Sequence, residues 1–139
     1  MRILADTNVI IDALTSREPW NKSVEKIFLM AANQTIEMYI TASSATDIYY
    51  LIRKYLHNTE AAKSIMGKLF SLTGILDVGA NDCIDALASS INDYEDAVVE
   101  KVAHRNDMDY IVTRNIKDYQ AGDTKIILPD DFVKLVEEE

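Results

Sequence analysis

The chain has 139 residues, of which 48% are hydrophobic, and this predicts one globular domain over residues 1–139. No apolar run reaches transmembrane length and no basic-then-apolar leader is present, so we expect a soluble, cytoplasmic protein that makes no membrane contact. One cysteine and two histidines exclude an internal disulfide and a structural zinc site, so a bound metal would take oxygen ligands, as Mg²⁺ or Mn²⁺ does.

The net charge of −9 is unevenly distributed along the chain. Residues 1–70 carry 8 Lys/Arg and 7 Asp/Glu, whereas residues 71–139 carry 6 and 16. A chain this acidic does not have the basic surface of an ordinary nucleic-acid binder, so a bound polyanion would need metal ions or a local basic segment. Residues 53–68 supply such a segment, because they contain Arg53, Lys54, His57, Lys63 and Lys68 against Glu60 alone.

Hydrophobic periodicity predicts strands that alternate with helices, beginning with a strand over residues 2–5 and a helix from about Asn8. A longer helix is expected over residues 21–32, and a strand over residues 38–40. Ser43 and Ser44 are typical helix caps and predict a third helix, which breaks at residues 57–59. Thr59 predicts the cap of a fourth helix, which runs to about residue 70.

The second half of the chain continues the same alternation. A strand over residues 75–78 precedes a helix opened by Asn81 or Asp82, and residues 92–95 fit a capping box for a helix that runs to about residue 105. Strands over residues 110–112 and 125–128 follow, and Asp130 is expected to cap a last helix from Pro129. Strands separated by helices predict an α/β fold with a mostly parallel sheet between helical layers.

Acidic residues stand where several of these elements meet. Asp6 ends the first strand, Asp47 lies near the start of the helix after the second strand, and Asp96 lies near the start of the helix after residue 92. Residues 113–119, which include Asp118, follow the strand at 110–112. Because the carboxyl ends of parallel strands share one edge of a sheet, we expect these residues to converge there.

Carboxylates that converge without counter-ions raise one another's pKa values, and a shared divalent cation relieves that repulsion. Mg²⁺ prefers oxygen ligands and bridges protein carboxylates to phosphates, and it activates water for attack on a phosphodiester. Glu100 lies one helical turn after Asp96 and is predicted to be an outer, supporting residue. The residues alone therefore favour a metal-dependent site of phosphate chemistry.

In this order the motifs resemble those of the PIN domain, a small nuclease module that includes the VapC-like toxins. The resemblance covers about residues 2–128. It rests on the Asp-Thr-Asn run at 6–8, on Asp47 and Asp96 at the places of the second and third acids, and on segments 112–115 and 117–119, which are similar to the TRD-or-TRN and DF motifs. It implies a Rossmann-like three-layer α/β/α sandwich and a Mg²⁺ or Mn²⁺ site.

The resemblance also implies cleavage of single-stranded RNA, a frequent role as the toxin of a toxin–antitoxin pair, an antitoxin protein as partner, and a homodimer. The catalytic residues that it predicts are Asp6, Asp47, Asp96, Asn115 and Asp118, whose four carboxylates would also be the metal ligands. Asn8 and Thr113 are expected to support them, and Arg114, Lys117, Arg53 and Lys54 are expected to contact RNA.

The chain departs from the family pattern at two places. Asp47 is one methylene shorter than the glutamate that the family usually carries there, which predicts coordination through water. Asn115 stands where many members have aspartate, so it brings an oxygen without a charge, and Asp118 is the alternative ligand.

Other interpretations of the same residues remain open at this point. Asp6, Asp47 and Asp96 are also typical of helix starts, where an acid stabilises the helix dipole. A degraded site would leave a non-catalytic PIN-like module that binds a protein or RNA. An aspartyl-phosphate phosphohydrolase is disfavoured, because that chemistry usually needs a second acid two residues after Asp6, where this chain has Asn8.

Overall fold

The computed structural model describes residues 1–119 and 122–138. Its strands are β1 (Arg2–Ala5), β2 (Glu37–Thr41), β3 (Thr73–Leu76), β4 (Tyr110–Val112) and β5 (Ile126–Ile127). Its helices are α1 (Thr7–Leu14), α2 (Asn21–Ala32), α3 (Ala42–Leu56), α4 (Thr59–Leu72), α5 (Ala80–Ala86), α6 (Tyr94–Arg105), α7 (Ile116–Tyr119) and α8 (Pro129–Glu137). Within these ranges, none of the helices has the length and apolar character needed to cross a membrane.

The strands of the described residues form one five-stranded sheet in the order β3-β2-β1-β4-β5, and all its pairs are parallel. The chain moves outward from β1 through β2 to β3 and then returns to the other side of β1 as β4. The strand order therefore reverses between β1 and β4. In open α/β sheets a ligand crevice lies outside the carboxyl ends of the strands at this point of reversal.

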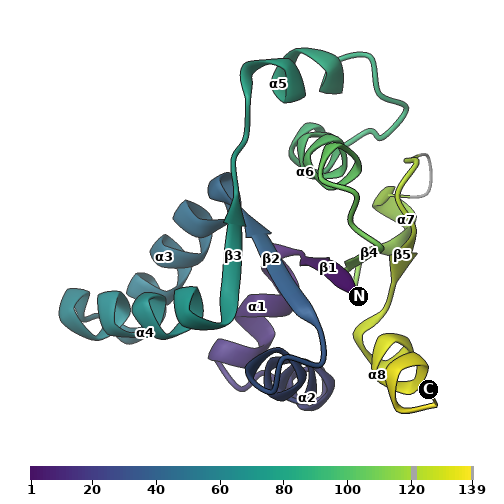
Figure 1. Cartoon of the computed structure of the whole chain (residues 1–139). Coiled ribbons are helices and arrows are strands. Elements are labelled where there is room, and N and C mark those ends of the chain that lie inside the picture. The colour runs from purple at the N-terminus through teal and green to yellow at the C-terminus, as the bar shows by residue number, and fades with distance from the viewer. Residues whose placement is uncertain (120–121, 139) are drawn as a thin grey trace.

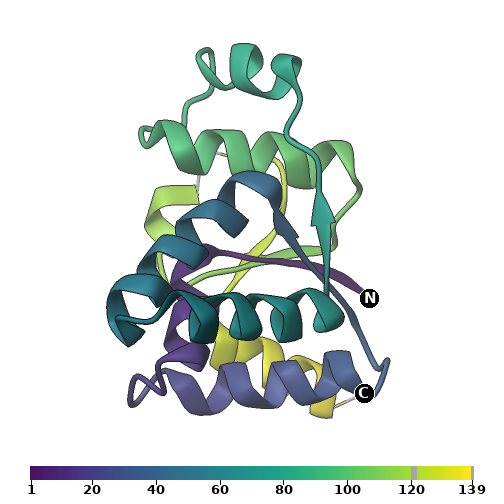
Figure 2. The same cartoon turned by 90° about the vertical axis from the view of Figure 1, so that its left-hand side faces the viewer.

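Two helical layers cover the two faces of the sheet (Figures 1 and 2). Successive residues of β1 point to opposite faces, because side chains alternate along a strand. Ile3 and Ala5 pack with helices α1–α4 and α8, whereas Leu4 packs with α5, α6 and α7. The predicted α/β/α sandwich with a parallel sheet is thus confirmed, and each layer has its own buried core.

Several helices begin one or two residues away from the predicted cap. Thr41 caps α3, because its Oγ1 accepts a hydrogen bond from the Ser44 amide at 3.0 Å, whereas Ser43 and Ser44 lie inside the helix. Asn58, not Thr59, caps α4, and Gly79 precedes α5 while the Asp82 carboxylate accepts from its amide at 2.8 Å. In each case the residue that precedes the helix has the extended backbone that a cap requires.

The last elements also differ from their predicted ends. Leu128 precedes α8 without a side-chain cap, and Asp130 instead accepts a hydrogen bond from Ser23 of α2. A side-chain cap is less important here because Pro129 opens the helix with a fixed φ and no amide to satisfy. The strand predicted at 75–78 is β3 at Thr73–Leu76, and the short helix α7 follows β4, where the sequence analysis expected no helix.

Candidate active site

Asp6 lies at the point where the strand order reverses. Its amide donates to the Val112 carbonyl of β4 at 3.0 Å, so the carboxyl ends of β1 and β4 are held side by side. Its Oδ1 accepts from the Thr7 amide at 2.8 Å and thereby caps α1, while its Oδ2 accepts from the Thr113 hydroxyl at 2.9 Å. Asn8 directs its amide toward the same oxygen at 3.4 Å. The Asp6 carboxylate therefore caps α1 with one oxygen, while Thr113 and Asn8 fix its other oxygen in place.

The Asp6 side chain is buried, with 7% of the residue exposed. Burial raises its pKa because water no longer solvates the charge, while hydrogen bonds from Thr113, Thr7 and Tyr119 lower it in part. A buried acid whose pKa is raised by burial and lowered in part by hydrogen bonds is a candidate for binding a cation.

Asp96 faces Asp6 from the first turn of α6. The helix is capped by Asp93, whose Oδ1 accepts from the Asp96 amide at 3.0 Å, one residue later than Asn92 of the predicted capping box. Burial raises the pKa of Asp96 to about 6, and the negative charges of Asp6 and Asp93 add to the increase. The Tyr119 hydroxyl donates to Asp96 Oδ1 at 3.2 Å and counteracts part of this effect.

Asp47 lies in the second turn of α3 and reaches the same cavity from the opposite side. A hydrogen bond with Asp47 raises the pKa of Glu95 to about 7, with burial as the next cause. The raised pKa of Glu95 therefore marks a place where negative charge is in excess. Glu95 was not among the predicted site residues, although it directly precedes Asp96 in the sequence.

These residues line one cavity of about 660 Å³ between α1, α3 and α6. The cavity contains the predicted residues Asp6, Asn8, Asp47, Asp96 and Asn115. It also contains Thr7 and Ser44, whose hydroxyls are linked by a 3.0 Å hydrogen bond and which the sequence prediction missed. Ser44 is buried and accepts from Thr41 as well, so a hydroxyl chain fixes the start of α3 against α1.

The segment after β4 contributes unequally to the cavity. Thr113 is fully buried and its Oγ1 also accepts from the Asn115 amide at 3.1 Å, so Thr113 holds this turn against Asp6. Asn115 lines the cavity, whereas Asp118 and Lys117 line a neighbouring hollow with Leu128. Asp118 is nevertheless near enough that its charge contributes to the raised pKa of Asp96.

Glu100 lies away from the cavity. It is 2% exposed and accepts a hydrogen bond from the Thr124 hydroxyl at 3.0 Å, on the side of α6 that faces the end of the sheet near β5. Four residues of helix carry Glu100 about 6 Å along the axis from Asp96, which is enough to change its neighbours. The structure gives Glu100 a local partner in Thr124, and its outer, supporting role stays a prediction.

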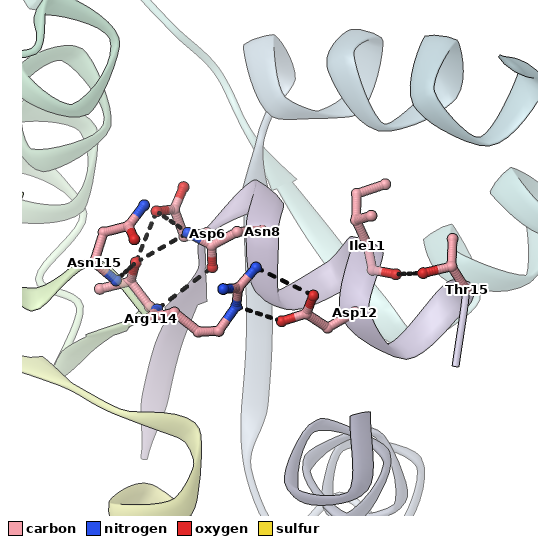
Figure 3. Close-up of polar contacts among 8 residues, drawn as sticks. Asp6, Asn8, Ile11, Asp12, Thr15, Arg114 and Asn115 are labelled. Atoms are coloured by element: carbon pink, nitrogen blue, oxygen red, sulfur yellow. Dashed lines mark hydrogen bonds and ion pairs between the residues drawn. The ribbon is translucent and has the colours of Figure 1, made fainter. Parts of the chain in front are cut away.

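The four predicted RNA-contacting cations also have different positions. Arg53 and Lys54 lie in the last turn of α3, about 9 Å or more along the axis from Asp47, and Arg53 donates to Thr59. Arg114 lines the cavity, but its guanidinium donates to both carboxylate oxygens of Asp12, at 2.6 and 3.3 Å (Figure 3). Asp12 is fully buried, so its main partner is Arg114.

The raised pKa values predict how stability depends on pH in the absence of metal. The folded-state pKa values of Asp96 and Glu95, about 6 and about 7, exceed those of an unfolded chain, so the folded protein binds more protons between pH 4 and 7. The free energy of unfolding should therefore fall as pH rises through this range. Urea titrations across it check the trend, and Asp96→Asn should flatten it; a stability that increased over the range would contradict the assignment.

One family model and several solved structures match this chain. The PIN domain model matches residues 2–117. A chain of VapBC2 from Rickettsia felis, bound to a promoter DNA fragment, is 18% identical with a TM-score of 0.69, covering 92% of this chain and 98% of that one. DNA-bound VapBC from Salmonella typhimurium is 17% identical with a TM-score of 0.69, covering 93% and 98%.

A third structure differs more. Mycobacterium tuberculosis VapC20, described as a toxin that cleaves the sarcin–ricin loop, is 14% identical with a TM-score of 0.60, covering 78% of this chain and 86% of that one. No curated protein matches the sequence. The family model spans most of the chain, and the five parallel strands carry the predicted acids to one edge. The chain belongs to the PIN domain family.

Proposed function

We propose that this protein is a divalent-metal-dependent endoribonuclease that cleaves single-stranded RNA and acts as the toxin of a toxin–antitoxin pair. The observation that carries the proposal is the convergence of Asp6, Asp47 and Asp96 on one cavity at the point of strand reversal. Membership of the PIN family and the likeness to VapBC structures support it. An antitoxin chain, a homodimer and a cytoplasmic location belong to the same proposal.

The donors around the cavity fit a hard divalent cation. They are carboxylate oxygens, and the pKa of Asp96 is raised partly by the unbalanced charge of Asp6. Across residues 1–119 and 122–138, no three His, Cys, Asp or Glu side chains are gathered closely enough to hold an ion by themselves. Mg²⁺ is usually held by one or two carboxylates together with water and substrate phosphate. Asp6 and Asp96 would be those ligands, with Asp47 acting through water.

The chain's own residues have defined tasks in this proposal. When bound, the cation supplies activated water and stabilises negative charge on the scissile phosphate. Asp6 is held in place because Thr113 and Thr7 donate hydrogen bonds to its carboxylate, and Tyr119 orients Asp96 in the same way. Glu95 lies beside Asp47 and adds to the negative charge of the cavity, which a bound cation would offset.

The direct test is cleavage of a labelled mixed-sequence single-stranded RNA with Mg²⁺, with Mn²⁺ and with EDTA. We expect cleavage with either metal and none with EDTA, and we expect Asp96→Asn to remove it. Thermal melting on the same samples shows whether metal binds, because an ion at a hundredfold excess over its Kd adds about 2.7 kcal/mol of stability. A folded wild type that neither cuts RNA nor gains stability with metal would instead be a non-catalytic binding module.

Tyr119 offers a second test of the metal site. It is 1% exposed, and its hydroxyl donates to Asp96 where the family motif has phenylalanine. The Tyr119→Phe variant should keep its fold but bind Mn²⁺ about 10- to 100-fold more weakly, as is typical when a partner of a ligand is removed. Electron paramagnetic resonance of free Mn²⁺ measures this directly. An unchanged Mn²⁺ affinity would mean that the hydroxyl only fills space.

A further inference from the structure

Arg17 is the cation that remains available in the cavity. Arg17 and Arg114 are the basic residues of its lining, and the charge of Arg114 is neutralised by buried Asp12. Over residues 1–119 and 122–138, the Arg17 guanidinium makes no ion pair and no hydrogen bond, and the residue is exposed. Among the described residues, the cavity is thus lined by four acids without a cationic partner and by one guanidinium whose charge is not neutralised.

The segment between α1 and α2 holds Arg17 in place. The Arg17 amide donates to the Asp12 carbonyl, and its own carbonyl accepts from the Asn21 amide, both at 2.9 Å. The Arg17 guanidinium lies 5.2 Å from the centroid of the Trp20 ring, and that of Arg114 lies 4.5 Å from it. Trp20, which is 40% exposed, thus joins the available cation to the anchored one. Cation–π contacts of this kind fix a guanidinium without neutralising its charge.

We propose that Arg17, oriented by Trp20, forms a subsite that binds a phosphate of the single-stranded RNA next to the phosphate being cleaved. This rests on the proposed ribonuclease function and assigns a residue that the sequence prediction missed. RNA that enters an acidic cavity is repelled at the phosphates that the metal does not neutralise, and a nearby positive charge offsets this repulsion. A planar guanidinium supplies this charge with paired donors that match phosphate oxygens.

An acidic segment of a protein partner is the competing occupant, since a carboxylate also pairs with arginine. The observations favour RNA, because Arg17 opens into the same cavity as Asp6 and Asp96 and not onto a separate surface. The two occupants differ in their dependence on salt and on RNA, so one experiment separates them.

The test measures binding of a fluorescein-labelled single-stranded RNA by anisotropy, with Mg²⁺, in the Asp6→Asn background, where RNA should stay intact. Arg17→Gln should weaken binding to all RNA sequences alike and reduce the slope of log K against log salt by about 0.7, the value for one lost phosphate contact on a single strand. The affinity ratio between parent and variant should fall about 2.6-fold between roughly 50 and 200 mM salt.

The matched control is Lys125→Gln, which removes one exposed positive charge near Met1 and Asp109, at the opposite edge of the sheet. Lys125→Gln should leave the slope of log K against log salt unchanged, because it removes a charge that does not contact a phosphate of the bound RNA. Trp20 is the only tryptophan in the chain, so its emission reports on this subsite. RNA should alter that emission with the same Kd as the anisotropy, and Arg17→Gln should diminish the change.

In the wild-type background, Arg17→Gln should raise KM for RNA cleavage with kcat retained, as expected for a contact made equally before and during the reaction. The subsite would be overturned if Arg17→Gln changed neither the salt slope of RNA binding nor KM, and if RNA left the Trp20 emission unchanged. If the protein still cut RNA, the proposed ribonuclease function would stand. The acidic partner would then be the occupant of Arg17. A wild type that does not cut or bind RNA would overturn the proposed function itself.

Discussion

The Asp6→Asn variant is expected to lose metal-dependent RNA cleavage to background while keeping a melting temperature at or above that of wild type. The cation supplies several kcal/mol of transition-state charge stabilisation, which corresponds to roughly a thousandfold or more in rate, and an uncharged amide holds it poorly. The amide is nearly the same size as the carboxylate, and its oxygen still accepts from the Thr7 amide. Burial raises the pKa of Asp6, so removing the charge also removes a desolvation cost.

Cleavage of labelled RNA and thermal melting without metal, run on the same preparation, separate these two effects. Asp85→Asn is the matched control, because Asp85 is an exposed acid on α5 that does not line the cavity. It should cut RNA as wild type does. Full cleavage by Asp6→Asn would show that the carboxylate at the point of strand reversal serves only to cap α1.

Much of this arrangement follows from local sequence pattern. The bounds of α2 and β4 agree with their predictions, because α2 has a helical hydrophobic periodicity and β4 is a short apolar run between the polar residues Asp109 and Thr113. The alternation of strands and helices then requires a parallel sheet, and a parallel sheet brings Asp6, Asp47 and Asp96 toward one edge. The convergence of these three acids was therefore predictable from the topology of the sheet. Short motifs in the right order along the chain were sufficient to indicate that topology.

The contacts between side chains could not be predicted from the sequence pattern in the same way. Glu95 and Asp96 are adjacent in the sequence, and nothing in their spacing indicates that Glu95 meets Asp47 across the cavity. Tyr119 appears at the end of a short segment, but its hydroxyl reaches Asp96 only because α7 folds over the end of β4. Such contacts depend on how helices pack against each other, which hydrophobic periodicity does not describe.

The positions of charged residues in the sequence do not show which of them are paired in the fold, for a related reason. Arg114 flanks the site in the sequence and has the character of a phosphate ligand, yet the structure pairs it with an acid 102 residues away. Asp12 lies inside α1 and is fully buried, so it needs a partner of opposite charge. The acid that determines the role of Arg114 is therefore visible only after the helix has been placed against the turn that follows β4.

The Arg114→Ala variant should accordingly lose about 3–5 kcal/mol of stability, because it leaves the Asp12 carboxylate buried without a counter-charge. This is a large share of the roughly 5–15 kcal/mol that stabilises an ordinary domain. Urea unfolding at pH 7 measures the loss. The double variant Asp12→Ala with Arg114→Ala should lose less than the sum of the two single variants, since the second substitution removes the unpaired charge that the first creates.

Lys117→Ala provides the control, since Lys117 is an exposed cation three residues further along and should change stability by no more than about 0.5 kcal/mol. The pair of variants also separates two roles for Arg114. Arg114→Ala could unfold at the same urea concentration as wild type and yet bind RNA weakly. The Arg114 guanidinium would then bind an RNA phosphate, and its ion pair with Asp12 would contribute little to stability. A destabilised Arg114→Ala that regains stability with Asp12→Ala would show that Arg114 anchors Asp12, and through Trp20 fixes the position of Arg17.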